Sequence, residues 1–502
     1  MQRSAPLWLL VLLQGAVSAA SLVVEIVAGR MIAPYVGMSL YTWTAIIAVV
    51  LAGFSAGHWW GGRIAEAGSA SALRRTGWSM VGAALTTGVA ALLLRQVAGP
   101  VLSAAPDPLM AITLLTTAVF FLPSFFAGVP APVLAVIAVR DTDRAGRSLG
   151  AMFAAGAIGA IAGTLLAGFL FISWLGSALT LAVVTATYAL AALLLFRLAG
   201  AAARAAALPL AVLVAAVGLS GAGLLLPKVC DRESQYFCIR TVVLSDAPGP
   251  PVRLMVIDHL AHGISGADPT LMFTEHTAML DRIARLRMGG RSFSSFFIGG
   301  GSYSIPRAWA ARATGPLTVA EIDPEVTDAA ASDFWFDRDS ARVLHEDARR
   351  ALRLRDARYD VIVGDAFTDI AVPAHLVTKE FFELVRDRLT EDGVYLMNVI
   401  DFTDRLDALA SLVATLRTVF PSVEVWTEER PPGRAERRVF VLVAGAAPSP
   451  QSRFVAAAPD PVPFAALADA FVDGLISRKT PVILTDDYAP IDRLVGLGAL
   501  TD

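Results

Sequence analysis

The sequence predicts a multi-span α-helical membrane domain followed by a water-soluble α/β domain. Of its 502 residues, 55% are hydrophobic and 17% charged, whereas an ordinary soluble domain is about a quarter charged. Residues 1–227 hold few charges and long apolar runs, and from Ser292 onward strand-like and helix-like segments alternate. We therefore expect three parts: a membrane domain over 1–227, a small β-hairpin part over 228–268 and a doubly wound α/β domain over 269–502.

Composition and charge exclude several classes of protein. Disordered, collagen-like and disulfide-rich chains have other compositions. The 41 basic and 44 acidic residues give a net charge of −3, without the basic excess of a nucleic-acid-binding protein. The six histidines show no ligand spacing such as His-x-x-Glu-His. We expect neither a nucleic-acid partner nor a metal.

The first 227 residues contain seven candidate membrane spans. A bilayer core of about 30 Å needs about 20 apolar residues in a helix. The spans are Leu7–Gly29, Tyr41–Trp60, Trp78–Leu94, Leu109–Val139, Leu149–Trp174, Ala178–Phe196 and Leu208–Leu226.

Two of these spans carry features that affect their packing. Three prolines in the fourth span, Pro123, Pro130 and Pro132, predict a kinked or broken helix. Small residues over Gly156–Gly163 in the fifth span predict a face for close helix packing. At the end of the first span, Arg30 is open to two interpretations, a functional intramembrane charge or a side chain that snorkels to the interface.

The loops and the two cysteines bear on orientation. Most loop arginines follow the second, fourth and sixth spans, so the positive-inside rule places the N-terminus inside and, after seven spans, the soluble half outside. Cys230 and Cys238 lie at the junction, where we favour two unlinked thiols. A disulfide requires that this segment face an oxidising compartment.

The soluble half alternates strands with helices. Ile239–Leu244 and Val252–Ile257, separated by a Pro/Gly turn over 247–251, predict a β-hairpin, and Thr270–Leu286 predicts a helix. Helices are also expected from Ile305–Arg312, Thr378–Leu389 and Arg405–Val419. The expected strands of a mostly parallel sheet are Phe293–Ile298, Leu317–Ile322, Arg342–Leu344, Tyr359–Val363, Val394–Ile400, Val423–Trp426 and Arg438–Ala444.

Four motifs follow strands of this sheet at their carboxyl ends, where such sheets bind ligands. Gly299–Gly301 lets the backbone approach a ligand closely, and Glu321, 22 positions after Gly299, has the spacing of a carboxylate that binds ribose hydroxyls. Asp347 follows the third strand and Asp365 the fourth. Each has a structural alternative: a simple turn for the glycines, helix N-terminal acids for Glu321 and Asp347, and a loop cap for Asp365.

These residues resemble those of the spermidine/spermine synthase family, the polyamine aminopropyltransferases. The resemblance covers about Asp231–Asp502, and the Glu25–Gly37 stretch is similar to the bacterial membrane-fused form of the family. It implies a small β domain followed by a Rossmann-like, class I methyltransferase-like sheet.

The resemblance assigns residues to a nucleoside donor, decarboxylated S-adenosylmethionine. Gly299, Gly300 and Gly301 match the family's glycine motif, Glu321 the glutamate that holds the ribose, and Asp347 the acidic pair beside the adenine. The position after the triplet is an aspartate in the family and Ser302 here. Serine cannot neutralise the donor's ammonium, so S-adenosylmethionine itself stays open as the donor.

The resemblance also assigns residues to the acceptor amine. Asp365 matches the aspartate that acts on the attacking amine, and Asp369 stands one position later than the family's second aspartate. Tyr236 resembles the tyrosine that lines the substrate site, and Glu275 lies in a Y-x-E element with Phe273 in place of the tyrosine. The carboxylates of the closing Leu484–Pro490 motif either face the cleft or cap the last helix.

The resemblance implies a membrane-bound transferase that moves an aminopropyl group to a diamine such as putrescine. The alternatives are an S-adenosylmethionine-dependent methyltransferase-like enzyme, and a polyamine-binding or transport protein whose synthase-like domain is not catalytic. We expect a multi-pass protein of the bacterial inner membrane, with the lipid bilayer as a partner; a homo-oligomer is left open. Because nucleoside donors are made in the cytoplasm, the chemistry favours a soluble half inside the cell. The loop charges, by contrast, favour a soluble half outside.

Overall fold

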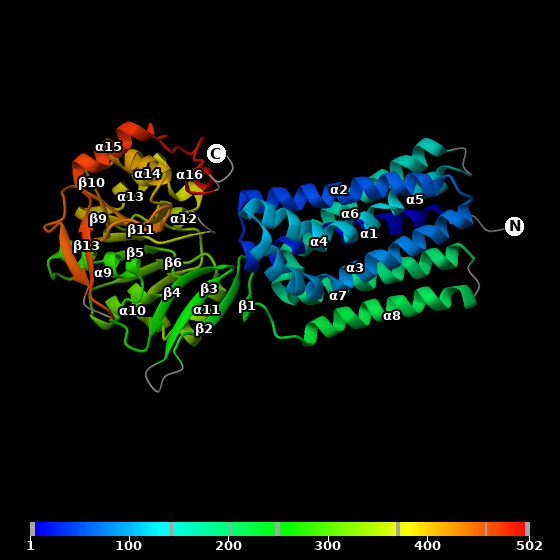
Figure 1. The fold of residues 1–502 in the computed structure, drawn as a ribbon, viewed down its shortest axis with the longest axis horizontal. Coiled ribbons are helices and arrows are strands. Elements are labelled where there is room, and N and C mark those ends of the chain that lie inside the picture. The colour runs from blue at the N-terminus through cyan, green and yellow to red at the C-terminus, as the bar shows by residue number, and fades with distance from the viewer. Residues whose placement is uncertain are drawn as a thin grey trace. The chain divides into compact units, whose positions relative to one another are not determined.

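The structure is a computed structural model that describes residues 6–140, 144–200, 203–245, 251–367, 372–456 and 459–496. The chain divides into two compact units, Met1–Cys238 and Ile239–Asp502. The first is a bundle of long helices and the second contains two sheets with their covering helices (Figure 1). The first unit ends at Cys238, later than residue 227, where the membrane domain is predicted to end. The predicted organisation in three parts stays a prediction.

Long apolar helices make up the first unit, because a helix satisfies its backbone hydrogen bonds within itself and can bury an all-apolar surface in lipid. Within the described residues, six helical segments are long and apolar enough to cross a membrane, as expected of a membrane protein. The helices are α1 (Leu7–Val36), α2 (Leu40–Ala65), α3 (Ser69–Ala104), α4 (Pro108–Gly128), α5 (Pro130–Arg140), α6 (Ala145–Leu166), η1 (Ala167–Phe171), α7 (Ile172–Leu198) and α8 (Ala203–Leu225).

The fifth apolar segment, Ala145–Leu198, covers two of the seven predicted spans. As one straight helix its 54 residues would extend about 80 Å, far more than a bilayer core of about 30 Å. Gly176 interrupts it with a φ of 71° and a ψ of 172°. Both α6 and α7 pack against α1, which has only 30 residues, so the chain turns back at this interruption. If α6 and α7 cross separately, the six segments make seven crossings, and the seven spans stay a prediction.

The proline-rich fourth span is divided, as the sequence predicts. α4 ends at Gly128 and α5 begins at Pro130, so two of the three prolines, Pro130 and Pro132, lie in the first turn of the second helix. Proline is tolerated there because the first N–H groups of a helix have no partner within it.

Close packing of α6 on α1 depends on glycine. A Cβ at Gly159 would lie 2.2 Å from the carbonyl oxygen of Gly15, and a Cβ at Gly163 would lie 2.2 Å from that of Ala19. Any side chain at these positions would push the two helices apart. The small-residue face predicted for this segment is confirmed.

Replacing Gly163 by leucine should therefore destabilise the bundle by about 1–3 kcal/mol or more, through overpacking. A lower melting temperature of the detergent-solubilised chain, followed by tryptophan fluorescence, would show this. Gly150→Leu is the matched control, because it lies in the same helix and a Cβ there would contact nothing within 4 Å. An equal loss for both variants would contradict the packing argument.

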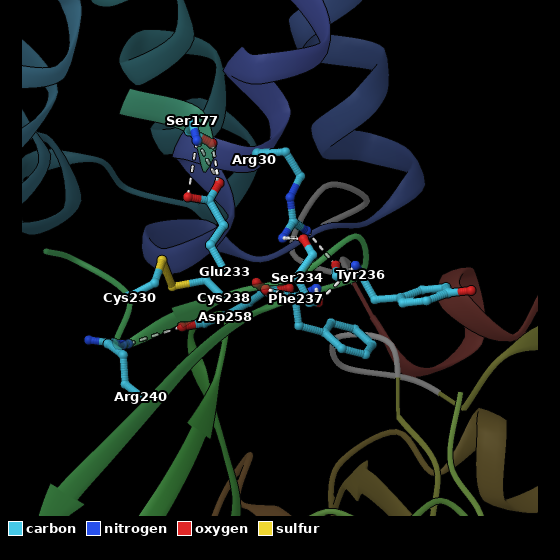
Figure 2. The surroundings of a disulfide bond; sticks show 10 residues. All are labelled: Arg30, Ser177, Cys230, Glu233, Ser234, Tyr236, Phe237, Cys238, Arg240 and Asp258. Atoms are coloured by element: carbon cyan, nitrogen blue, oxygen red, sulfur yellow. Dashed lines mark hydrogen bonds between the residues drawn. A yellow bond between two sulfur atoms is a disulfide. The ribbon is translucent and has the colours of Figure 1, made fainter. Parts of the chain in front are cut away.

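Cys230 and Cys238 form a disulfide bond, with their Cα atoms 5.2 Å apart (Figure 2). Our interpretation of these cysteines as two unlinked thiols is therefore wrong. The pair lies within the usual Cα separation of a disulfide, which the sequence could not reveal. Disulfides persist in oxidising compartments, so this bond bears directly on the orientation of the chain.

In the described part of the chain, the side chains of Arg30 and Glu233 attach the junction segment, Lys228–Cys238, to the helices (Figure 2). Arg30 donates to the carbonyl oxygen of Ser234 at 3.1 Å and also to that of Tyr236. The Glu233 carboxylate accepts from the backbone N–H of Ser177 at 3.1 and 3.2 Å. Because Ser177 follows the interruption at Gly176, Glu233 satisfies an N–H group at the start of a helical segment.

The second unit begins with an antiparallel sheet of β2 (Cys238–Val243), β3 (Val252–Ile257) and β4 (Leu260–Gly266). β2 and β3 confirm the predicted hairpin, although most of its turn over 247–251 lies outside the described residues. β4 was not predicted, because Gly263 and Gly266 interrupt its apolar alternation.

A nine-stranded sheet follows, in the order β12-β13-β10-β11-β9-β8-β5-β6-β7. The five strands from β9 to β7 are parallel, and β11, β10, β13 and β12 add antiparallel pairs. The bounds are β5 (Ser295–Ile298), β6 (Leu317–Ala320), β7 (Arg342–Leu344), β8 (Tyr359–Gly364), β9 (Leu389–Phe402), β10 (Ser422–Glu428), β11 (Arg437–Gly445), β12 (Arg453–Ala456) and β13 (Val462–Ala466).

Helices connect these strands, and the helices bury their apolar faces against the sheet. The predicted doubly wound Rossmann-like fold requires this packing. Phe381 and Phe382 of one helix and Leu412 of another are at most 1% exposed. The helices are α9 (Glu275–Met288), α10 (Ser304–Ala311), α11 (Pro324–Asp333), α12 (Ala348–Arg353), α13 (Lys379–Asp387), α14 (Asp407–Arg417), α15 (Asp469–Lys479) and α16 (Ile491–Val495).

Candidate active site

The strand order of the large sheet reverses between β5 and β8, the place where open α/β sheets bind ligands. The loops after these two strands lie against each other. Gly299, directly after β5, has a φ of 91°, and a Cβ there would lie 2.6 Å from the carbonyl oxygen of Asp365. Only glycine permits this approach. The predicted glycine motif and Asp365 are thereby brought together.

Glu321, directly after β6, faces the same glycine loop. Its Oε2 accepts from the backbone N–H of Gly300 at 2.8 Å, and its Oε1 accepts from that of Asp323 at 2.9 Å. The residue is 6% exposed, and this burial raises the pKa of its carboxyl to about 7, although the two backbone donors act in the opposite direction. Each oxygen keeps a lone pair for a further donor, such as a ligand hydroxyl.

Asp365, directly after β8, is held by an amide and lies near two histidines. Asn398 of β9 donates from Nδ2 to one carboxylate oxygen at 2.8 Å, and Nε2 of His276 lies 3.8 Å from the other. The Asp365 side chain keeps 26% of its surface exposed, enough to meet a ligand. His262 is near enough to interact electrostatically with it. Burial lowers the pKa of His262 to about 4, so this imidazole is neutral at pH 7.

Asp347 has the helix-capping role that the sequence offered as its structural alternative. Its Oδ1 accepts from the backbone N–H of Arg350 at the start of α12, and its Oδ2 lies 2.7 Å from Nε2 of His375. The hydrogen bond from His375 lowers the pKa of this carboxyl below its usual value. A role beside an adenine stays a prediction.

Ser302 is buried and already hydrogen-bonded. Its hydroxyl lies 2.8 Å from that of Ser304, which lies 2.8 Å from that of Ser265. A Cβ at Gly263 would lie 2.1 Å from the Ser302 hydroxyl. The Ser302 hydroxyl is therefore closely packed against Gly263 and Ser304, and a donor-binding role for Ser302 stays a prediction.

The three predicted acceptor-binding residues are not brought together by the described contacts. Glu275 is the first residue of α9, where burial raises its pKa and Glu428 raises it further. Tyr236 belongs to the first unit, with 42% of its surface exposed. Asp369 lies outside the described residues. The predicted roles of all three stay predictions.

The closing motif does not cap the last helix. Asp486 accepts from Arg349 at 2.6 and 2.7 Å and from the hydroxyl of Thr378 at 2.7 Å. The N-cap position of α16 is Pro490, without a side-chain hydrogen bond. Asp486 thus connects α12 with the start of α13.

Two residues beside Asp365 were missed by the sequence reasoning. Asn398 is a lone amide within the apolar segment Val394–Ile400, and this polar residue in a buried segment could have marked it. His276 lies within the predicted helix Thr270–Leu286, and its spacing does not distinguish it from the other positions of that helix. Only the pairing of β8 with β9, which aligns Gly364 with Met397, places Asn398 next to Asp365.

Part of this second unit matches a known protein family. Residues 314–431 match the family model described as "Spermine/spermidine synthase domain". The resemblance to polyamine aminopropyltransferases is confirmed. We call Ile239–Asp502 the synthase-like unit.

Two curated relatives and one solved structure illustrate the similarity. A "Probable polyamine aminopropyl transferase" of Bifidobacterium longum is 31% identical over 131 residues, covering 26% of this chain and 29% of its own length. A "Polyamine aminopropyltransferase" of Vibrio vulnificus is 34% identical over 128 residues, which cover 24% of this chain and 42% of that relative. The chain thus spans less than half of each relative. A probable spermidine synthase of Corynebacterium glutamicum is 20% identical, with a TM-score of 0.45, over 51% of this chain and 96% of its own.

Proposed function

We propose that this protein is a membrane-bound polyamine aminopropyltransferase, which transfers an aminopropyl group from decarboxylated S-adenosylmethionine to a diamine such as putrescine. The observation that carries the proposal is the carboxylate of Asp365, held by Asn398 at the strand reversal beside the glycine loop. The similarity of the synthase-like unit to polyamine aminopropyltransferases supports it.

The donor would lie across the loops after β5, β6 and β7. Glu321 would accept hydrogen bonds from the ribose hydroxyls through its two remaining lone pairs. Gly299, Gly300 and Gly301 would let the nucleoside approach the backbone, with Asp347 towards the adenine.

The reaction is an in-line displacement at carbon. The amine nitrogen of the acceptor forms a bond to the aminopropyl carbon that is attached to sulfur. The bond between that carbon and sulfur breaks, and its electron pair stays on sulfur, which gives methylthioadenosine. The attacking amine must be neutral, although alkylamines like that of lysine have a pKa of about 10.4. Asp365 would take its proton, and Glu275 and Asp369 would bind the distal ammonium of the diamine. Much of the rate gain would come from holding the amine against the reacting carbon.

A methyltransferase-like activity is the second candidate, favoured by Ser302. A serine that is engaged with Ser304 offers no carboxylate to the donor's ammonium. The third candidate is a non-catalytic domain that senses or binds polyamines for the membrane unit. The hydrogen bond that positions Asp365 argues against this candidate, because a non-catalytic domain does not require it.

A product assay separates these candidates. The detergent-purified full chain would receive putrescine with either decarboxylated S-adenosylmethionine or S-adenosylmethionine, and products would be identified by mass spectrometry. Spermidine with methylthioadenosine supports the proposal. A methylated product with S-adenosylhomocysteine supports the methyltransferase, and absence of turnover from both donors contradicts both enzymatic functions.

Donor binding should depend on pH through Glu321. Since the ionised carboxylate accepts the ribose hydroxyls, protonation below a pKa of about 7 should weaken binding of methylthioadenosine by up to about tenfold per pH unit, and affinity should level off above pH 7. Glu321→Gln should weaken binding by roughly ten- to hundredfold and remove this pH dependence. Calorimetry between pH 5.5 and 8.5 measures both. Glu391→Gln, at an exposed glutamate, is the control, and a pH profile unchanged in Glu321→Gln would refute the assignment.

We also propose that the chain is a multi-pass protein of a bacterial-type inner membrane whose synthase-like unit faces the oxidising side. Two observations support this orientation, the loop arginines and the Cys230–Cys238 disulfide. The orientation also rests on the predicted seven crossings, in which α6 and α7 of the fifth apolar segment cross separately. An external enzyme would need its nucleoside donor on that side of the membrane.

A further inference from the structure

A cavity of about 350 Å³ lies within the first unit, at the end of the bundle where the junction segment begins. It is formed by the C-terminal part of α1, residues 91–95 of α3, the interrupted start of α7, the end of α8 and residues 228–233. The proposed aminopropyl transfer uses none of its residues.

Three cationic side chains line this cavity, those of Arg30, Arg95 and Lys228. Among the residues that the structure describes, neither Arg95 nor Lys228 has an ion pair or hydrogen bond. Arg30 uses both terminal nitrogens on the junction segment, but its buried Nε has no acceptor, and the buried hydroxyl of Ser173 likewise has no partner in the described part of the chain. Arg95 and Lys228 therefore bring unused donors to this cavity.

The carboxylates in the wall offset these charges only in part. Glu233 lines the cavity, but its two oxygens are occupied by the N–H and hydroxyl of Ser177. Asp231 is the other carboxylate, against the three cations Arg30, Arg95 and Lys228. The excess of positive charge suits an anion.

The remaining wall is apolar and continues to the outside of the bundle. Trp174 lines the cavity with 83% of its surface exposed, and Leu224 with 41%. Exposed tryptophan and leucine at the end of a membrane helix are placed to contact lipid at the interface. An anion here would therefore have apolar chains beside it.

We propose that this cavity binds the phosphate of an anionic phospholipid head group. Arg95 and Lys228 would pair with the phosphate, and the acyl chains would lie over Trp174. Because Lys228 and Glu233 belong to the junction segment, the bound lipid stabilises the chain beside the disulfide.

The test measures the melting temperature of the full chain in detergent with three probes at equal concentration. These are dioctanoyl phosphatidylglycerol, dioctanoyl phosphatidylcholine and inorganic phosphate. The expected result is a saturable rise with phosphatidylglycerol alone. An equal rise with phosphatidylcholine, or the full rise with inorganic phosphate, would overturn the assignment to an anionic lipid. Absence of any rise in melting temperature with phosphatidylglycerol would overturn it too.

Variants locate the site. Arg95→Gln combined with Lys228→Gln should abolish the rise. Arg74→Gln with Arg75→Gln should preserve it, because those exposed arginines lie on the same helix α3 about 30 Å from Arg95. If the cavity variant does not fold, native mass spectrometry of the wild-type chain decides instead: retention of phosphatidylglycerol over phosphatidylcholine supports the site, and equal retention contradicts it.

Discussion

Asp365→Asn should lower kcat by roughly 10²–10⁴-fold, the contribution that a positioned general base makes. Asparagine has almost the same shape and can still accept the hydrogen bond from Asn398, but its amide oxygen cannot take a proton from the attacking amine. The loss should therefore appear in turnover and not in donor affinity. Steady-state rates of methylthioadenosine release and calorimetric binding of methylthioadenosine measure the two quantities separately.

Asp356→Asn is the matched control, because it removes the same charge just before the same strand, from a fully exposed side chain. It should leave kcat unchanged within about twofold, since surface substitutions have small effects. If Asp365→Asn retained kcat, the proton would have to leave by another group, and His276, 3.8 Å away, would be the next to replace. If instead Asp365→Asn lost donor binding and kept kcat, Asp365 would be a binding residue.

The sequence predicted those parts of the fold that depend on local pattern. Runs of apolar residues predict long helices, and the strands of the parallel sheet, buried on both faces, are short apolar segments that end in glycine or acidic residues. The placement of Gly299 and Asp365 followed from one rule about strand ends. β12 and β13 were missed, because Arg453–Ala456 and Val462–Ala466 are short and mixed in polarity.

Other features depend on contacts between distant residues, which a local pattern does not contain. Asn398 reaches Asp365 through strand pairing, and Arg30 finds its acceptors more than 200 positions later in the junction segment. Likewise, the sequence shows that two cysteines are near each other along the chain, but not the backbone path that brings their Cα atoms within 5.2 Å.

The disulfide makes the orientation of the chain directly measurable, with an all-or-none expected result. Cys230 and Cys238 are the only cysteines in the sequence, so the wild-type chain carries its own probe. In intact spheroplasts, a maleimide that does not cross the membrane should label nothing until a reductant that also does not cross it is added. Both thiols should then react without lysis, as shown by a gel-shift assay.

A cysteine on the opposite side of the membrane supplies the control. Glu66→Cys, in the loop between α2 and α3 near Arg63, combined with serine at both native positions, should be labelled only after lysis. The opposite pattern, with native thiols free and reached only after lysis, would place the synthase-like unit in the cytoplasm and the donor in its ordinary compartment. The expected pattern would instead place the synthase-like unit outside, as the loop charges predict, although nucleoside donors are made in the cytoplasm. The donor, or an external substitute for it, must then reach Glu321 from outside the cell membrane.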